Sequence, residues 1–344
     1  MNKAIILTLF SLMLIGCAPK QVVFFDSPYE LKFPDKKAEF IKSYSKYINN
    51  KKIFIDPGHG GKDERGAIGN LKIVEEAIIN LKVATYLKDF IKEAGGIVYM
   101  SRTTDSTVEL KPRSVAANNS GADIFVSVHH NAPGDDSDEW INYTSTYYHA
   151  LPSDYEYEPC QNDIAKYIQR DISYAVRNSG GPASFDGTYS DYSIYPKAGF
   201  SVLRLTKIPA VLVECAFVTN NYQENKLALD EYNRIEAWGI FKGLCRYFSQ
   251  SIPTISSADA KLSGDSKDLV ESFYIKDTVG IKSTSIVVYI DSVKTNNFTF
   301  VKNSGLLKIK TDDLQEGDHI IRIIAENKNG NHSFPFYKKF QIVK

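Results

Sequence analysis

Apolar strand-like segments alternate with helical segments between residues 51 and 250, and this alternation constrains the fold more than any other feature of the chain. Stretches with an apolar residue at every third or fourth position predict three helices, over residues 75–94, 162–176 and 231–248. Short apolar runs predict six strands, over residues 52–56, 97–101, 123–129, 144–149, 201–205 and 210–215. Strands that are separated by helices of this length pair in parallel. We therefore predict an α/β domain whose open, twisted, mostly parallel or mixed sheet is covered by helices on both faces.

The pattern changes after residue 250. Residues 251–268 are rich in Ser, Asp and Lys and have few apolar residues, which is typical of a linker. Helical periodicity is absent beyond this segment, and turn sequences separate short alternating strands, over 285–290, 306–310, 319–325 and 337–343. We predict a smaller all-β sandwich over residues 269–344, after the α/β domain over 51–250.

The first 17 residues have the features of an export signal. Lys3 precedes an apolar stretch of thirteen residues, which is shorter than the ~20 residues that a membrane-spanning helix requires. The segment LIGC, which ends at Cys17, resembles the lipobox of bacterial lipoproteins, and this resemblance implies that Cys17 carries a lipid. We expect a lipid-anchored protein of the bacterial cell envelope, periplasmic or at the cell surface, with residues 18–50 as a tether that contains a short amphipathic element. The alternative is a plain secretory signal with a coincidental cysteine.

Charge and cysteine content exclude two classes of site. The chain has 41 basic and 41 acidic residues, so it lacks the net positive charge that favours nucleic acid, and we expect no nucleic-acid partner. Cys160, Cys215 and Cys245 cannot all pair within one chain, because their number is odd. They form no C-x-x-C spacing, which disfavours a thiolate metal site.

Four polar residues of the predicted α/β domain stand where a strand ends or a helix begins. His59 lies in the segment DPGHGG, directly after the first strand, and His129 and Glu214 end two other strands. The carboxyl ends of parallel strands meet at one edge of a sheet, so these three side chains should lie close together. Glu76 reaches the same edge from the first turn of the next helix. Two imidazoles and one carboxylate around a free position form the His₂Glu ligand set of a catalytic zinc site.

The apolar run AVLVECAFV gives Glu214 a separate role. A carboxylate in such surroundings costs several kcal/mol unless it is paired or associated with a metal. Zinc lowers the pKa of a bound water to about 7 and polarises a carbonyl group. Glu214 could then act as general base towards that water and as general acid towards a leaving amine, which predicts amide hydrolysis. Taken singly, the residues also have structural explanations, since a glutamate at a helix start often only complements the helix dipole.

Seven segments resemble the zinc-dependent N-acetylmuramoyl-L-alanine amidases of family 3, over roughly residues 52–248. These segments are IFIDPGHGGKDERGAIG, EAIINL, SRTTD, LKPRSVAAN, ADIFVSVHHNA, STYY and IPAVLVECAFVTN. The resemblance implies that His59, Glu76 and His129 bind zinc and that Glu214 is catalytic. It also implies the substrate, peptidoglycan, and the bond that is cleaved, which is the amide between N-acetylmuramic acid and L-alanine of the stem peptide.

The chain departs from the pattern of this family in places. Both Glu75 and Glu76 precede the helix, and we choose Glu76 because it keeps the five-residue spacing to Leu81. His130 stands where the family often has a small residue, and we expect a bystander, since adjacent strand residues point to opposite faces. Residues 132–199 differ most, and they leave the substrate-binding residues unassigned.

Two alternative functions follow from the same residues. A catalytically inactive relative could act as a wall-binding or regulatory lipoprotein, although all four site residues are present. A zinc carboxypeptidase-like enzyme would need a basic pocket, for which Arg204 on the predicted strand 201–205 is a candidate. The segment LQEGDHIIRIIAENKNGNHSF resembles the final strands of bacterial immunoglobulin-like domains. It suggests that the C-terminal domain positions the enzyme against the cell wall or a protein partner.

Overall fold

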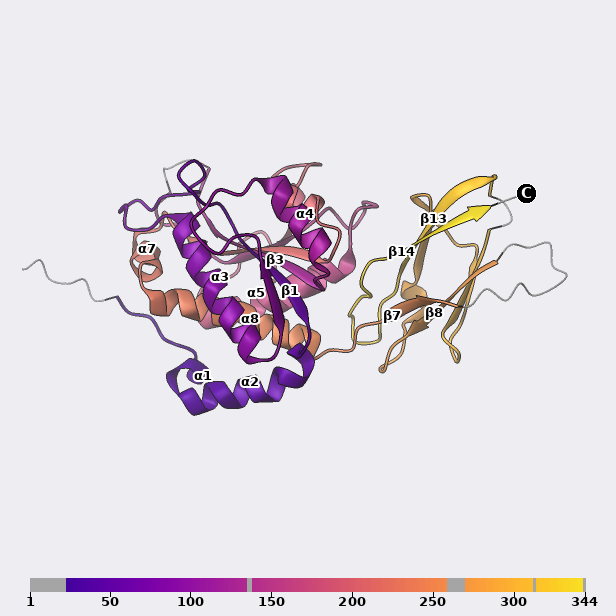
Figure 1. The fold of residues 1–344 in the computed structure, drawn as a ribbon, viewed down its shortest axis with the longest axis horizontal. Helices are drawn as coiled ribbons and strands as arrows, with labels where there is room; N and C mark the ends of the chain where they lie inside the picture. The colour runs from indigo at the N-terminus through magenta and orange to yellow at the C-terminus, as the bar shows by residue number, and fades with distance from the viewer. Residues whose placement is uncertain (1–22, 135–137, 259–269, 312–313, 343–344) are drawn as a thin grey trace, which may run out of the picture.

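The computed structural model describes residues 23–134, 138–258, 270–311 and 314–342. The export signal and Cys17 lie outside these ranges. Figure 1 shows an α/β body followed by a smaller β body, joined by the chain near residue 250. No helix in the described ranges combines the length and the apolar character that crossing a membrane requires.

The sheet of the α/β body is mixed, with strand order β2-β1-β3-β6-β4-β5. The first four strands in this order are parallel, β4 runs antiparallel to β6, and β5 is parallel to β4. Their bounds are β1 Lys52–Pro57, β2 Ile97–Met100, β3 Ile124–Asn131, β4 Ser145–Tyr148, β5 Thr188–Ser190 and β6 Ala210–Phe217. The predicted fold class, a mostly parallel or mixed sheet between helices, is confirmed.

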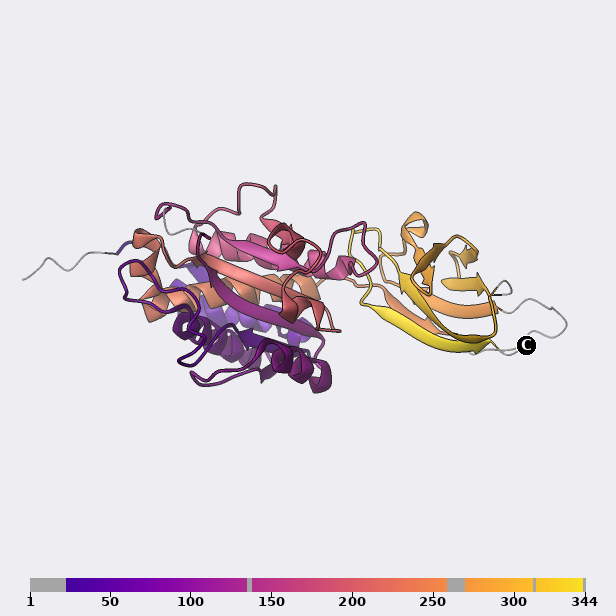
Figure 2. The same cartoon turned by 90° about the horizontal axis from the view of Figure 1, so that it is seen from above.

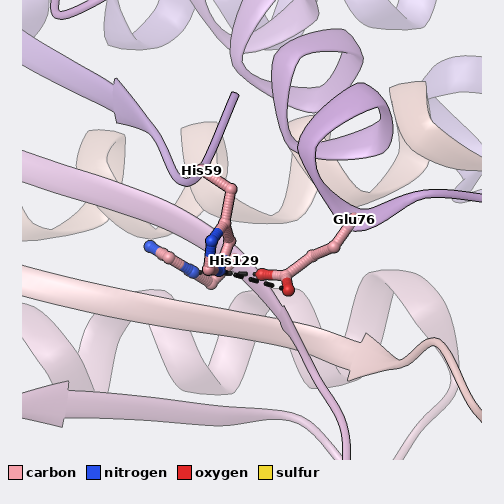
Figure 3. A group of neighbouring side chains, drawn as sticks. All are labelled: His59, Glu76 and His129. Carbon is pink, nitrogen blue, oxygen red and sulfur yellow. Dashed lines mark hydrogen bonds and ion pairs between the residues drawn. The ribbon is translucent and has the colours of Figure 1, made fainter. Parts of the chain in front are cut away.

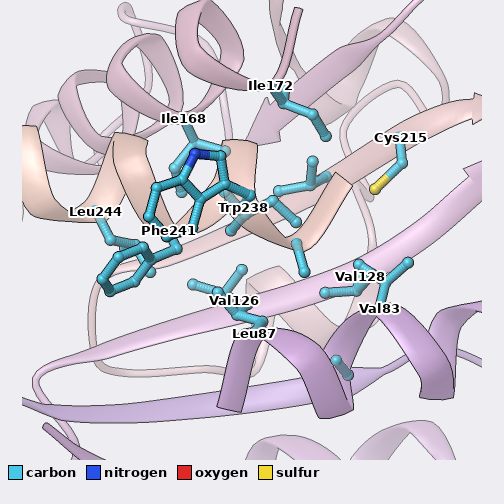
Figure 4. Packing of buried hydrophobic residues seen from close by; sticks show 14 of the residues in the cluster. Val83, Leu87, Val126, Val128, Ile168, Ile172, Cys215, Trp238, Phe241 and Leu244 are labelled. Carbon is cyan, nitrogen blue, oxygen red and sulfur yellow. The ribbon is translucent and has the colours of Figure 1, made fainter. Parts of the chain in front are cut away.

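Helices cover both faces of this sheet. Side chains of alternate strand residues point to opposite faces, so Ile53 and Ile55 belong to one apolar cluster whereas Phe54 belongs to another. The larger cluster contains Trp238 and lies against α3, α5 and α8 (Figure 4). Phe54 faces α4 and α6. The helices are α1 Tyr29–Lys32, α2 Pro34–Ile48, α3 Glu76–Glu93, α4 Leu110–Ser120, α5 Pro159–Val176, α6 Ser201–Arg204, α7 Asn221–Leu227 and α8 Asp230–Phe248, with a 3₁₀ turn at Asp191–Ser193.

Two segments differ from the secondary structure that the sequence predicts. Residues 201–205, predicted as a strand, form the short helix α6 and not a strand of the sheet. An apolar run of five residues fits either state, because its length is too short to show a period. The amphipathic element predicted within residues 18–50 is helix α2. Its Ile41 and Ile48 are buried in the larger cluster, so this part of the segment is packed on the α/β body.

The β body consists of two four-stranded antiparallel sheets, ordered β10-β9-β13-β14 and β11-β12-β8-β7. Phe273 and Leu307 of one sheet share a buried cluster with Val288 and Ile321 of the other, so the sheets pack face to face. The strands are β7 Thr254–Ser257, β8 Val270–Lys276, β9 Val287–Ile290, β10 Val293–Thr295, β11 Phe298–Val301, β12 Leu306–Lys310, β13 Gly317–Ile324 and β14 Phe336–Ile342, with a 3₁₀ turn at Ser283–Ser285.

Part of the predicted linker, residues 251–268, belongs to the sheet that contains β8. Thr254–Ser257 forms edge strand β7 and pairs with β8. The linker prediction is wrong for these residues because an edge strand exposes most of its side chains, and its composition therefore resembles that of a linker.

One buried arginine joins the two bodies, which lie end to end in Figure 2. Arg322 of β13 is 1% exposed. Its guanidinium donates to the backbone oxygens of Tyr155 and, at 2.6 Å, Tyr157, and it lies 3.1 Å from the Glu158 carboxylate. The rings of Tyr155 and Tyr289 lie 5.0 and 5.3 Å from it. We call this set of contacts the Arg322 junction.

Candidate metal centre and active site

His59 occupies the loop that leaves β1, and its backbone is in the left-handed region at φ 58°. Neighbouring glycines allow the close packing around it. A Cβ on Gly58 would lie 2.2 Å from the His129 ring, and a Cβ on Gly66 would lie 2.4 Å from Glu76 Oε2. The lack of a side chain at these two positions is therefore what lets the three functional side chains approach one another.

The structure brings His59, Glu76 and His129 together at the carboxyl edge of the sheet (Figure 3). Glu76 Oε2 lies 3.3 Å from His59 Nε2, and Glu76 Oε1 lies 3.1 Å from His129 Nδ1. One potential ligand atom from each residue falls within 4.8 Å of the other two. Two nitrogens and a carboxylate oxygen at this spacing can hold a metal ion. Glu75 pairs with Arg65 instead, away from this group.

Burial and charge act in opposite directions on these groups. Burial favours the neutral form of Glu76, yet hydrogen bonds with His129 and His59 outweigh it and hold the pKa of Glu76 well below its usual range. Burial also disfavours a charged His59, but the Glu76 carboxylate beside it raises the pKa of His59. The Glu76 carboxylate thus stays negatively charged between two imidazoles. This negative charge would attract a divalent cation.

Glu214 lies beside this cluster on β6, at the position that pairs with His129 on β3. Its Oε2 atom is buried and has no hydrogen-bond partner among the described residues. Burial, and then the charge of Glu76, raise the pKa of Glu214 well above its usual value. A buried carboxylate oxygen without a partner is costly in a folded protein, and this one lies next to the three residues that could hold a metal ion, which makes Glu214 a candidate functional residue.

These four side chains line one open groove of about 1160 Å³. Tyr195 and Arg204 also line it, and Arg204 Nη1 donates to the Ala198 backbone oxygen at 2.5 Å. Tyr189 is half-buried and packs on Tyr147, which lines the groove, with ring centroids 5.6 Å apart.

Two buried arginines hold the loop that carries His59. Arg113 donates to the backbone oxygens of Pro57 and His59, both at 2.8 Å, and it forms an ion pair with Asp56 at 2.7 Å. Arg102 donates to the backbone oxygens of Pro57 and Gly58, both at 2.9 Å. Both arginines therefore hold this loop in place, and nothing in the sequence marks Asp56 as the counter-ion of Arg113.

Two further polar residues, Asn80 and Glu224, stabilise the site, and the sequence gives no clear signal for either. Asn80, one turn after Glu76 on α3, donates to Glu76 Oε1 at 3.2 Å. Glu224 of α7 accepts hydrogen bonds from the backbone of Leu71 at 2.6 Å and Ile73 at 2.9 Å, and it thereby fixes the loop before α3. Its only signal in the sequence is a glutamate in a short polar helix, which is a common surface pattern.

The three cysteines outside the export signal do not take part in the groove. Cys160, Cys215 and Cys245 are unpaired and buried. Burial raises the pKa of each thiol well above its usual value, which makes them unreactive.

The chain is similar to known amidases over its α/β body. The N-acetylmuramoyl-L-alanine amidase family matches residues 53–246. The chain is 29% identical to the germination-specific N-acetylmuramoyl-L-alanine amidase of Bacillus subtilis, over 61% of this chain and 84% of that protein. It is 33% identical to the N-acetylmuramoyl-L-alanine amidase CwlM of Bacillus licheniformis, over 58% and 70%.

A solved structure is similar to this chain in its fold. The amidase Ami1 of Mycobacterium smegmatis matches with a TM-score of 0.51 at 17% identity, over 58% of this chain and 98% of that chain. The family match covers more than half of the present chain, and the groove described above falls within it. The chain therefore belongs to the N-acetylmuramoyl-L-alanine amidase family.

Proposed function

We propose that this amidase cleaves the bond between the lactyl carbonyl of N-acetylmuramic acid and the L-alanine nitrogen of the peptidoglycan stem peptide, with zinc as cofactor. The family supports the substrate. One observation carries the mechanism: Glu214, whose buried Oε2 has no partner among the described residues, lines the same groove as His59, Glu76 and His129.

His59, Glu76 and His129 are the residues that would hold the zinc ion. Two imidazole nitrogens and one carboxylate oxygen form the donor set of catalytic zinc sites, which leave a position open for water or substrate. The bound ion would lower the pKa of a water molecule and polarise the scissile carbonyl. The partly exposed rings of His59 and His129 border the groove, so an ion held by them would be accessible from it.

Glu214 moves the proton. Its carboxylate takes a proton from the attacking water as the water oxygen bonds to the carbonyl carbon, and it then gives that proton to the amide nitrogen as the C–N bond breaks. The products are a free lactyl carboxylate and a peptide with an L-alanine amino terminus. The second step needs a protonated carboxyl group, and burial, which raises the pKa of Glu214, favours that form.

We further propose that the enzyme is attached to the envelope by a lipid on Cys17 and that the β body is an immunoglobulin-like domain. The face-to-face sheets of residues 254–342 support a sandwich of this kind. A domain fixed beside the α/β body could hold the groove against the wall or contact a protein partner. A catalytically inactive wall-binding protein is less well supported, since the groove retains every residue that the reaction needs.

The function is tested with the chain that lacks residues 1–17. Purified peptidoglycan is incubated with this protein and zinc, and the soluble products are analysed by mass spectrometry for stem peptides that begin with L-alanine. We expect these peptides from the unaltered chain and a loss of about 10²- to 10⁴-fold in rate for Glu214→Gln. Glu316→Gln, which removes an exposed carboxylate in the β body, is the matched control and should retain full activity.

Two results would contradict the proposal. Glycan strands that keep all their peptides would reject the amidase function and favour the inactive wall-binding alternative. Equal rates for Glu214→Gln and the unaltered chain would reject the role of Glu214.

A further inference from the structure

A chain of buried polar groups extends from Glu76 into the core, away from the groove. Asn80 Nδ2 donates to Glu76 Oε1 at 3.2 Å, and Asn80 Oδ1 lies 2.7 Å from His130 Nδ1. His130 Nε2 in turn lies 3.2 Å from Glu236 Oε1 on α8. The backbone N–H of His130 also donates to Glu76 Oε1 at 3.2 Å. This Asn80–His130–Glu236 chain therefore ends on a residue of the ligand cluster.

The position of this chain in the core is unusual for polar groups. Asn80 and Glu236 are fully buried and His130 is 2% exposed. They lie on the sheet face that the large apolar cluster covers, since Val128 on the same side of β3 belongs to that cluster. Apolar residues at these sites would pack α3 and α8 on the sheet without the cost of burying a carboxylate. Packing alone therefore does not account for the three polar groups.

Hydrogen-bond directions along the Asn80–His130–Glu236 chain are fixed by the groups with which it starts and ends. Glu76 needs donors, so Asn80 presents Nδ2 to it and also to the Gly58 backbone oxygen at 3.2 Å, and Oδ1 then faces His130. His130 must consequently carry a hydrogen on Nδ1. With Nδ1–H in place, Nε2 either donates to the Glu236 carboxylate, when the ring carries hydrogens on both nitrogens, or accepts from the protonated Glu236 carboxyl group. His130 keeps Nδ1–H in both cases.

We propose that Glu236, acting through His130 and Asn80, is a positioning residue that fixes the Glu76 carboxylate in the orientation needed to bind metal. This inference rests on the proposed role of Glu76 as a zinc ligand. Without Glu236, His130 could place its hydrogen on Nε2, and Nδ1 would then repel Asn80 Oδ1. Asn80 would turn over and present an oxygen to Glu76. Groups behind the ligands of metal sites commonly change metal affinity by 10- to 100-fold.

A second reading of the same residues is a separate metal site. Potential ligand atoms of His130, Cys215 and Glu236 lie within 4.8 Å of one another. Both ring nitrogens of His130 already have polar neighbours, however, and burial raises the pKa of the Cys215 thiol well above its usual value. The positioning role accounts for these contacts without another ion, and the number of bound metal ions separates the two readings.

The test compares zinc binding by the chain without residues 1–17 and by its Glu236→Ala and Glu236→Gln variants. Affinity and stoichiometry are measured by competition with a chelator, and the cobalt-substituted proteins give the ligand-field absorption spectrum. We expect one zinc per chain, at least 10-fold weaker binding and an altered cobalt spectrum for Glu236→Ala. Glu236→Gln should stay near the unaltered value, because a glutamine N–H can donate to Nε2 and keep His130 in the same form.

Two further variants control for stability and folding. Ile240→Ala creates a cavity on the same helix, and it should lower stability without changing zinc affinity. If Glu236→Ala does not fold, the double variant His130→Leu/Glu236→Leu, which leaves no unpaired buried charge, should show the same loss of affinity, because Asn80 again lacks its partner.

Unchanged zinc affinity and an unchanged cobalt spectrum in Glu236→Ala would overturn the proposal. Two zinc ions per chain, with one lost in Glu236→Ala, would overturn it in favour of a separate metal site. Release of L-alanine-terminated peptides by the unaltered chain is measured in parallel. A failure of that assay alone would reject the proposed function and leave the positioning role intact.

Discussion

Gly58→Ala adds a single methyl group beside His59, Glu76 and His129, the proposed zinc ligands, and it should weaken zinc binding. The new Cβ would lie 2.2 Å from both Cε1 and Nε2 of His129. Ordinary van der Waals contact begins near 3.4 Å, so the ring would have to move by about 1.2 Å. Metal ligands tolerate only about 0.2 Å. We expect zinc affinity to fall by about 100-fold, or ~2.7 kcal/mol, with a comparable loss of kcat/KM.

The measurement is chelator competition for zinc, together with the rate of peptide release from peptidoglycan. Gly134→Ala is the matched control: it is the same substitution at the groove, and its Cβ would meet no atom within 4 Å. We expect it to bind zinc as tightly as the unaltered chain. Thermal unfolding of both variants separates loss of the site from loss of the fold. Zinc affinity in Gly58→Ala within twofold of the control would refute the reasoning, because His129 would then have moved freely.

Three further predictions concern charge. Arg113→Leu leaves the buried Asp56 carboxylate unpaired and should cost about 3–5 kcal/mol in urea unfolding, whereas a loss below 1 kcal/mol would contradict the pairing. In the metal-free chain, the raised pKa of Glu214 gives stability that is present below pH ~4.5 and is lost as the pH rises through the folded-state pKa. Glu214→Gln should therefore lessen the fall in stability towards neutral pH, and parallel urea curves across pH would count against this. Arg322→Ala, but not substitution of an exposed lysine such as Lys302, should release the two bodies and broaden the distance distribution in small-angle scattering; an unchanged profile would show that other contacts suffice.

Much of the site could be predicted because its residues occupy marked places in the pattern. His59 follows an apolar strand, His129 and Glu214 lie near the carboxyl ends of two others, and parallel strands bring these ends to one edge. The glycine-rich loop after β1 is also visible in the sequence, and the structure shows which contacts need glycine there. These features are local along the chain, so periodicity and turn chemistry identify them.

The remaining features depend on pairs that are distant in sequence. Glu236 and His130 are 106 residues apart, and neither position indicates its partner. His130, predicted as a bystander, does point away from the groove, but it faces a carboxylate that only the packing of α8 brings near. Helix α6 was missed for a different reason, since its apolar residues pack on α4 and fit a buried strand equally well.

The Arg322 junction makes it difficult to exchange either body of this chain for a domain of another protein. Its carboxylate and two of its acceptors come from residues 155–158, whereas the guanidinium and the rings of Tyr289 and Tyr337 come from the β body. A catalytic fragment cut at residue 250 would expose Glu158 without its cation, and a hybrid with another β domain would lack the arginine. Exchange of either part by recombination should therefore succeed only when both halves of the junction are transferred together.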